Sequence, residues 1–384
     1  MKTESLVFIL VTLALVLLGL LCMFSASYEE ALSFGFDSSY FLKRQIVFAV
    51  AAIVASFVIA LIPMRFFRFS VIPLMAICLI LMLLTLFTNF GVSTLGARRW
   101  LSLGPLPSFQ PSEIVKFSTI LFLASVLSIE DSHSKMVRQL ICAGVCLCFA
   151  TLILLQKDYS TTVVYLGVCI AMLLLSHVNL PWVLIGFGFL MVGGTAVMLS
   201  EPYRVKRIAA FLFPNLDPSG INYQVTIARK AISSGGLWGT GLGNGYYKKG
   251  ILPEVQNDFI LANIAEELGF AGVLLIFLLF IAFAVIGWRG SRRIWERDRF
   301  SGYAAFGFTT MIFWQSLVNA AVVSGLFPPT GIPMPFFSQG GTNLFVVIIE
   351  AGFLARIVRD SLSSRKAEVT LSAATDDLVF PEKP

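Results

Sequence analysis

Uncharged apolar runs of about 20 residues recur from one end of this chain to the other, and they constrain its fold more than any other feature. A run of this length can cross the hydrocarbon core of a bilayer as a helix, because a helix satisfies its backbone hydrogen bonds internally. Charged residues make up only 13% of the chain, against about 25% in a soluble globular protein, and hydrophobic residues reach 57%. The pattern excludes a soluble enzyme that carries a single membrane anchor.

The apolar runs predict an all-α fold, a polytopic membrane protein with ten transmembrane helices in a domain of residues 1–360. The predicted spans are residues 5–26, 45–63, 69–88, 112–129, 139–156, 160–177, 181–200, 259–288, 302–326 and 341–357. The first run is longer than the roughly 7–15 apolar residues of a signal-peptide core, so it is interpreted as a retained membrane anchor. The polar residues 361–384 predict a short, disordered cytoplasmic tail.

The Lys and Arg side chains of the short loops predict the orientation of these spans. Most of them fall on the side of the two termini, and the positive-inside rule therefore places both termini in the cytoplasm. One long outer loop, residues 201–258, runs against this bias, because it carries Arg204, Arg207 and other basic side chains. Two explanations for these outer basic residues remain open. Either they bind an anionic ligand outside the membrane, or a loop of this size is translocated regardless of its charge.

Composition removes several classes of function. The formal net charge of +6 suits a protein beside anionic lipids, but the chain has no Lys/Arg-rich tract of the nucleic-acid-binding type, so we expect no nucleic acid partner. All six cysteines lie inside apolar runs, which is typical of small buried hydrophobic residues rather than of disulfides or a zinc site. With two histidines in the chain, histidine-based metal binding or catalysis has almost no ligands to use.

Ionisable residues within the predicted spans are candidates for function, because a charge at mid-bilayer costs roughly 2.5–3.5 kcal/mol on insertion scales. Glu113 and Lys116 share a helix face, either as an ion pair at the membrane interface or as the wall of an outward-facing cavity. Glu266 and Glu267 point about 100° apart around their helix, so one of them can face a cavity, although helix packing explains them equally well. Glu350 is a lone acid in the last span, for which a structural role is favoured.

Asp258 stands where the long loop turns into the eighth span. Its position and type favour a helix N-cap, since Asp accepts hydrogen bonds from the N–H groups of a first turn. A helix N-terminus also stabilises the charged carboxylate and weakens it as a base, so catalysis by Asp258 requires burial or a neighbouring acid such as Glu254 or Glu266. The glycine-rich run 235–245 predicts close backbone packing or re-entrant turns against the outer leaflet, and the irregular segment 328–343 predicts the wall of a cavity.

Five segments, in the same order, resemble the SEDS family (shape, elongation, division and sporulation). They are ARRWLSLG at residues 97–104, QPSEIVK at 110–116, the set Tyr203, Arg204, Arg207 and Pro214, LPEVQNDF at 252–259 with EELG at 266–269, and PMPFFSQGG at 333–341. The resemblance covers residues 5 to 360, and Arg98, Arg99, Tyr223 and Gln224 are more similar to the division branch, FtsW, than to the elongation branch, RodA. The chain departs from the family before Asp258, where Gln-Asn stands in place of the commoner His-Thr.

The resemblance implies a peptidoglycan glycosyltransferase that polymerises lipid II on the outer face of the bacterial cytoplasmic (inner) membrane, at the division site. Its implied partners are a class B penicillin-binding protein and other divisome or elongasome membrane proteins. The resemblance also implies that Asp258 is the catalytic residue and that Glu113 and Lys116 line the central cavity. The other substrate-binding residues expected from the family motifs are Glu266, Ser338, Gly340 and Gly341.

We therefore expect Asp258 to act as general base on the 4-hydroxyl of an acceptor GlcNAc, which attacks and inverts the anomeric carbon of the donor MurNAc. Undecaprenyl pyrophosphate then leaves, and Arg98, Arg99, Arg204 and Arg207 are expected to neutralise it, because guanidinium groups suit phosphate oxygens. A divalent cation, Mg²⁺ or Mn²⁺, bridging the pyrophosphate is also compatible with the chemistry, without a recognisable protein cage. The alternatives are a lipid II flippase and a noncatalytic scaffold for a penicillin-binding protein.

Overall fold

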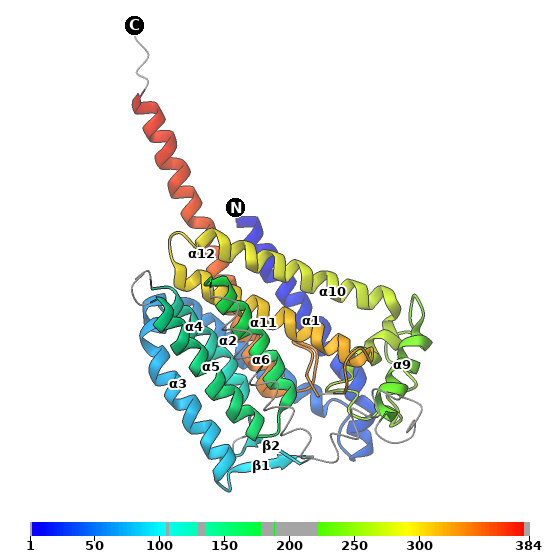
Figure 1. The fold of residues 1–384 in the computed structure, drawn as a ribbon. Helices are drawn as coiled ribbons and strands as arrows, with labels where there is room; N and C mark the ends of the chain where they lie inside the picture. Colours follow the sequence, from blue (N-terminus) through cyan, green and yellow to red (C-terminus); the bar gives the residue numbers. More distant parts are fainter. Residues whose placement is uncertain are drawn as a thin grey trace.

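The computed structural model describes residues 2–94, 96–104, 107–129, 135–177, 188, 222–329 and 331–379, and it is a bundle of long helices with one small hairpin (Figure 1). The helices are α1 (Lys2–Ser33), α2 (Tyr40–Leu61), α3 (Met64–Phe87), α4 (Pro111–Leu127), α5 (Lys135–Leu155), α6 (Tyr159–Leu175), α9 (Tyr223–Gly235), α10 (Ile260–Ile294), α11 (Arg299–Val323) and α12 (Gly341–Val379). The strands are β1 (Gly91–Thr94) and β2 (Ala97–Leu101).

Most of the predicted spans coincide with helices. In the described part of the chain, seven helices are long and apolar enough to cross a membrane, namely α1, α2, α3, α5, α10, α11 and α12. The helices α4 and α6 also occupy predicted spans, but each has only 17 residues. The predicted span at residues 181–200 lies outside the described residues, so the count of ten and the orientation of the termini stay predictions. The boundary at residue 360 also stays a prediction, and α12 continues past it.

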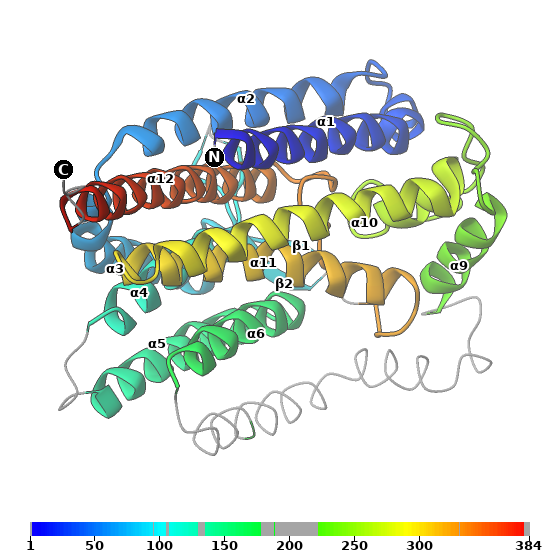
Figure 2. The same ribbon diagram turned by 90° about the horizontal axis from the view of Figure 1, so that it is seen from above.

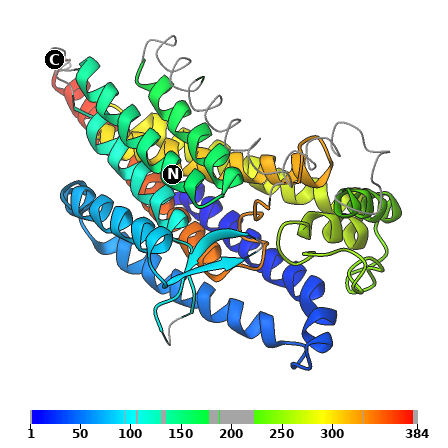
Figure 3. The same ribbon diagram turned by 60° about the horizontal axis from the view of Figure 1, so that its bottom comes forward.

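The hairpin of β1 and β2 corrects the prediction of a purely helical fold. The strands pair antiparallel, with Gly91 opposite Leu101 and Thr94 opposite Ala97, and Gly96 at the turn has a φ of +77°. The stretch between α3 and α4 is too short and too polar to cross a membrane, and pairing its two halves satisfies their backbone groups. Figure 3 shows the hairpin beside the loop that precedes α12.

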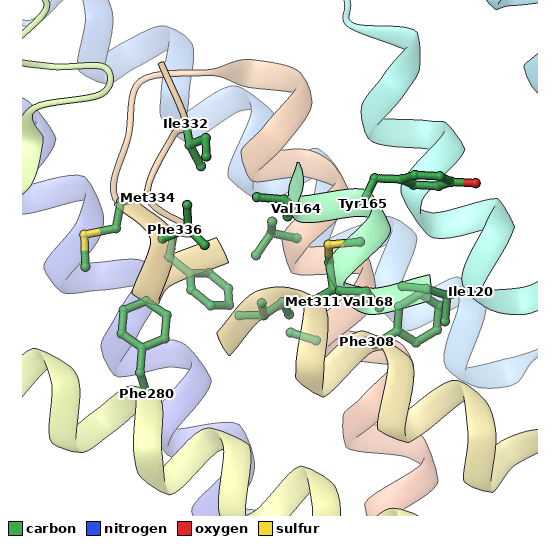
Figure 4. Packing of buried hydrophobic residues seen from close by; sticks show 14 of the residues in the cluster. Ile120, Val164, Tyr165, Val168, Phe280, Phe308, Met311, Ile332, Met334 and Phe336 are labelled. Carbon is green, nitrogen blue, oxygen red and sulfur yellow. The ribbon is translucent and has the colours of Figure 1, made fainter. Parts of the chain in front are cut away.

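The helices pack around a continuous apolar core. Helix α12 packs against α2, α10 and α1, and α10 packs against α11, α9 and α1 (Figure 2). The loop between α11 and α12 enters this core, because Ile332, Met334 and Phe336 are almost fully buried among side chains such as Phe280 (Figure 4). Helix α1 reaches the loop through Gly19, where a Cβ atom would stand 2.2 Å from the carbonyl oxygen of Phe336. The loop is therefore a fixed part of the bundle.

Helix α10 is interrupted at Gly269, whose φ of 67° and ψ of −171° are not helical. The backbone groups near the break are paired with the glycine-rich run: Phe270 N–H donates to Gly236 O at 2.9 Å, and Ala271 N–H donates to Leu237 O at 3.0 Å. A Cβ atom on Gly239 would lie 2.1 Å from Glu267 O. The close backbone packing predicted for the glycine-rich run is therefore confirmed.

Candidate active site

The predicted pair of Glu113 and Lys116 forms a buried ion pair on α4. Lys116 Nζ lies 2.8 Å from Glu113 Oε1, and the two residues are only 3% and 2% exposed. An interfacial pair with a snorkelling lysine would leave the ammonium group in water, so that alternative is wrong. A buried pair is stable only when its remaining donors and acceptors are also satisfied.

Amide side chains from α11 and α12 satisfy the pair. Lys116 Nζ donates to Gln315 Oε1 at 2.9 Å, and Asn343 Nδ2 donates to Glu113 Oε2 at 2.9 Å. Gln315 Nε2 in turn donates to the carbonyl oxygen of Pro333 at 2.9 Å. The ion pair is thus connected, through one amide, to the buried loop before α12.

The same loop reaches Asp258 through a second amide on α11. Asn319 is fully buried, and its Nδ2 donates to Asp258 O at 2.9 Å and to Ile332 O at 2.7 Å. The side chain of Asp258 points towards Gly331, whose φ is +76°. A Cβ atom added to Gly331 would lie 3.2 Å from Asp258 Oδ2. Any side chain at position 331 would crowd this carboxylate. Because Gln315 and Asn319 are one helical turn apart, they share a face of α11 and link the ion pair to the Asp258 backbone.

Asp258 itself is half-buried and precedes α10. The N-cap position of α10 is Phe259, so Asp258 does not occupy the N-cap position that its location and residue type favour. Asp258 still adjoins the N-terminus of α10, so stabilisation of its charged form by the helix end applies to it and weakens it as a base. Its role in catalysis stays a prediction.

The backbone around Asp258 is held by the PMPFFSQGG loop. Ser338 Oγ donates to Asn257 O at 2.6 Å and accepts from Met334 N–H at 2.7 Å. Gln339 N–H donates to Gln256 O at 2.8 Å, and Gln45 Nε2 on α2 donates to Ser338 O at 3.2 Å. Ser338 is 2% exposed, so it supports the loop that carries Asp258, and a direct contact with substrate stays a prediction.

A pocket of about 330 Å³ opens beside this loop. Its walls include Arg44 of α2, Trp100 of β2, Asn257, and the predicted binding residues Gly340 and Gly341. Arg44 is exposed, and no described residue forms an ion pair with it. The pocket therefore presents the cation of Arg44 and the aromatic rings of Trp100, Phe41 and Phe48 next to the residue before Asp258. Small residues at 340 and 341 leave room there.

Two of the four predicted arginines, Arg98 and Arg99, lie in the described residues, and each contacts another part of the protein. Arg98 caps the end of α3, because its guanidinium donates to the carbonyl oxygens of Leu86, Thr88 and Gly91. These bonds show a structural role for Arg98, and its contact with a pyrophosphate stays a prediction.

Arg99 is partly exposed and contacts the buried Asp158. Its Nη1 lies 3.7 Å from Oδ1 of Asp158, the N-cap of α6, and Gln110 donates to the other oxygen of that carboxylate. Arg99 therefore has a partner within the protein, and its contact with a pyrophosphate stays a prediction. Arg204 and Arg207 lie outside the described residues, so their contribution stays a prediction.

Glu266 binds the backbone directly after the glycine-rich run. Glu266 Oε1 accepts from the backbone N–H groups of Tyr246 and Tyr247. Its neighbour Glu267 pairs with Lys248 at 2.6 Å and accepts from Ser25 Oγ at 2.6 Å, and all of these side chains except the tyrosines are nearly fully buried. These contacts favour the helix-packing alternative for this pair, and a contact of Glu266 with substrate stays a prediction.

Sequence reasoning missed the amides Gln45, Gln315, Asn319 and Asn343. Their residue type could have indicated this role, because Asn and Gln side chains inside apolar helices commonly form hydrogen bonds to neighbouring helices. Among the described residues no three His, Cys, Asp or Glu side chains come together as metal ligands. These residues do not fit a protein-caged cation at the pyrophosphate, and no step of the reaction below uses one.

Comparison with known proteins agrees with the fold and the motifs. The family model FTSW_RODA_SPOVE, described as cell cycle protein, matches residues 5–362. Stage V sporulation protein E of Bacillus subtilis (strain 168) is 37% identical over 364 residues, which cover 94% of this chain and 98% of that protein. A Trichlorobacter lovleyi protein named "Probable peptidoglycan glycosyltransferase FtsW" is 35% identical over 360 residues, which cover 92% of both chains.

Solved structures show the same fold. A chain from a peptidoglycan synthase complex, described for its structural coordination of polymerization and crosslinking, superposes with a TM-score of 0.74 at 26% identity, covering 92% of this chain and 97% of that one. The rod shape determining protein RodA of Thermus thermophilus superposes with a TM-score of 0.66 at 24% identity, covering 92% and 96%. The second similarity concerns the fold alone.

Proposed function

We propose that this chain is a peptidoglycan glycosyltransferase whose general base is Asp258. The chain belongs to the FtsW, RodA and SpoVE family of cell cycle proteins. The observation that carries the base assignment is the hydrogen-bonded connection from the buried pair of Glu113 and Lys116, through Gln315 and Asn319, to the backbone of Asp258. A carboxylate on a backbone held in this way is preorganised for proton transfer.

The reaction requires one bond to form while another breaks. The 4-hydroxyl of an acceptor GlcNAc gives its proton to the Asp258 carboxylate as its oxygen bonds to the anomeric carbon of the donor MurNAc. The bond from that carbon to the phosphate oxygen breaks with inversion, and undecaprenyl pyrophosphate leaves with the electron pair. A positioned base contributes typically about 10²–10⁴-fold. The rest of the acceleration must come from positioning and from stabilisation of the leaving group.

Two surfaces support a lipid-linked substrate. The pocket at Arg44 and Trp100 offers a guanidinium for phosphate oxygens beside Asn257. A separate apolar groove of about 430 Å³ runs along α9, α10 and α11, and its walls include Leu261 and Ala265 in the first turns of α10. We assign the polyprenyl chain to this groove and the pyrophosphate to Arg44, with Arg204 and Arg207 as further cations.

Partners and location follow from the same proposal. A polymerase of lipid II works on the outer face of the cytoplasmic membrane, and the seven apolar helices suit a multi-pass protein there. The similar chain from a synthase complex that coordinates polymerization and crosslinking supports a class B penicillin-binding protein as the partner. The similarity to FtsW relatives supports action at the division site with other divisome proteins.

The test is the substitution Asp258→Asn, assayed by glycan polymerisation from lipid II with purified protein and partner. We expect the rate to fall about 10²–10⁴-fold with unchanged thermal unfolding. The matched control is Asp37→Asn, which removes an exposed carboxylate paired with Lys43 at 2.6 Å and should leave the rate unchanged. An Asp258→Asn rate equal to that of the control excludes the base assignment.

The same proteins separate the alternative functions. A flippase would move labelled lipid II across the membrane of proteoliposomes, and in the Asp258→Asn protein this movement would persist or vanish independently of polymer formation. A scaffold would support polymer formation by its partner with any residue at position 258. Loss of polymer in a complex that still assembles is expected only of a glycosyltransferase.

A further inference from the structure

A buried amide without partners lies in the first turns of α10, beside the glycine-rich run. Asn263 is 1% exposed, and neither its Oδ1 nor its Nδ2 has a hydrogen-bond partner among the described residues. Burial of an unsatisfied amide is unfavourable, so such a group indicates a bound water or ion at that place. The glycosyl transfer proposed above does not use Asn263, and the inference below does not rest on that reaction.

Three side-chain oxygen atoms of α10 converge on the space in front of Gly245. A Cβ atom added to Gly245 would contact all of them. It would lie 3.0 Å from Glu267 Oε1, 3.1 Å from Asn263 Oδ1 and 3.2 Å from Glu266 Oε2. Each of these three side chains is 1% exposed. The oxygen of the unpartnered amide therefore points into the same buried space as two carboxylates.

The protein does not balance the charge of this cluster. In the described part of the chain, the charged side chains around Glu266 are Glu267 and Lys248. Lys248 Nζ lies 2.6 Å from Glu267 Oε1 and neutralises that carboxylate. The partners of Glu266 are the backbone N–H groups of Tyr246 and Tyr247, which carry no full charge. One negative charge remains, and its burial is costly unless a cation or a proton binds there.

We propose that one alkali-metal cation, Na⁺ or K⁺, binds between Asn263, Glu266 and Glu267. Carboxylate and amide oxygens are ligands of hard cations, and all three converging atoms are of this kind. A single positive charge balances the remaining carboxylate. A divalent ion would leave an excess of positive charge beside Lys248, and Ca²⁺ takes six to eight oxygen ligands.

The test is thermal unfolding of the purified full chain at constant ionic strength. NaCl or KCl is exchanged for the chloride of N-methyl-D-glucamine, an organic cation too large for the space at Gly245. Above the dissociation constant, each tenfold increase in Na⁺ or K⁺ should raise the unfolding midpoint by roughly 2–4 °C. Equal midpoints in all three salts overturn the proposal, because a protonated Glu266 or a bound water gives that result.

A substitution at Gly245 tests the position of the ion. The φ of Gly245 is not positive, so Gly245→Ala is compatible with the backbone and fills the space with a methyl group. The matched control is Gly144→Ala on α5, where nothing lies within 4 Å of the added Cβ atom. The dependence of the midpoint on Na⁺ or K⁺ should vanish in Gly245→Ala and persist in the control.

A second variant keeps the test decisive if Gly245→Ala does not fold. Asn263→Leu removes one ligand and leaves Gly245 unchanged. It should weaken the binding of Na⁺ or K⁺ at least about 10-fold, and the midpoint should respond only at correspondingly higher salt. An unaltered response to Na⁺ or K⁺ in either variant places the ion elsewhere and overturns the site.

Discussion

Replacing Asn319 by Leu tests whether the α11 amides position Asp258. The substitution keeps the branching of the side chain, at a larger volume, and removes two hydrogen bonds, to Asp258 O at 2.9 Å and to Ile332 O at 2.7 Å. Each neutral hydrogen bond contributes about 1 kcal/mol net, so the loop loses about 2 kcal/mol of the interaction that fixes it. If the whole loss falls on the reactive geometry, kcat falls about 30-fold.

The assay is steady-state glycan polymerisation, with kcat and KM for lipid II measured separately. Because Asn319 is fully buried behind the loop, KM should change much less than kcat. The control is Thr309→Val on the same helix, since Thr309 Oγ1 is buried and has no hydrogen-bond partner among the described residues. An Asn319→Leu protein with unchanged kcat, or one that changes only KM, refutes positioning through this amide.

Three further substitutions test other contacts of the site. Lys116→Met leaves Glu113 buried without its cation and should lower the free energy of unfolding by about 3–5 kcal/mol. The double variant with Glu113→Gln should recover part of this stability. Thermal unfolding measures both variants, and no recovery in the double variant would contradict loss of the ion pair as the cause. Ser338→Ala removes two hydrogen bonds that hold the Asp258 loop and should lower kcat more than it raises KM, in contrast to a substrate ligand. Gly239→Ala places a Cβ atom 2.1 Å from Glu267 O at a φ of +78° and should lower the unfolding temperature measurably; an unchanged temperature would show that the packing against α10 is loose.

The elements that could be predicted from sequence depend on local properties. Apolar runs predicted α1, α2, α3, α5, α10, α11 and α12, because the ability of a helix to cross a membrane follows from its own length and composition. The spacing of Glu113 and Lys116 likewise predicted their contact, since residues three apart share a helix face. The hairpin between α3 and α4 was missed because its strands are short and their pairing is not encoded in hydrophobicity.

Side-chain roles that depend on distant contacts could not be predicted. Arg99 pairs with Asp158, which is far along the chain, so its type alone suggested a phosphate ligand. The amides Gln315 and Asn319 are visible in the sequence as a polar pair one turn apart on α11. Their significance depends on the loop that packs against them, whose path through the core follows from the approach of α1 at Gly19. Chemistry was therefore easier to predict than the geometry that supports it.

The structure also separates loss of chemistry from loss of geometry at Asp258. Three hydrogen bonds, from Gln339, Ser338 and Asn319, reach the backbone carbonyls of Gln256, Asn257 and Asp258, and none of these three bonds uses the carboxylate that becomes an amide. Asp258→Asn therefore removes the base and leaves the position of the residue intact, whereas Asn319→Leu keeps the base and releases its position. If Asp258 must be both deprotonated and correctly positioned, the Asp258→Asn variant should lose nearly all polymerase activity and the Asn319→Leu variant only part of it. The double variant should then be no slower than Asp258→Asn alone, because a mispositioned amide has no catalytic function left to lose.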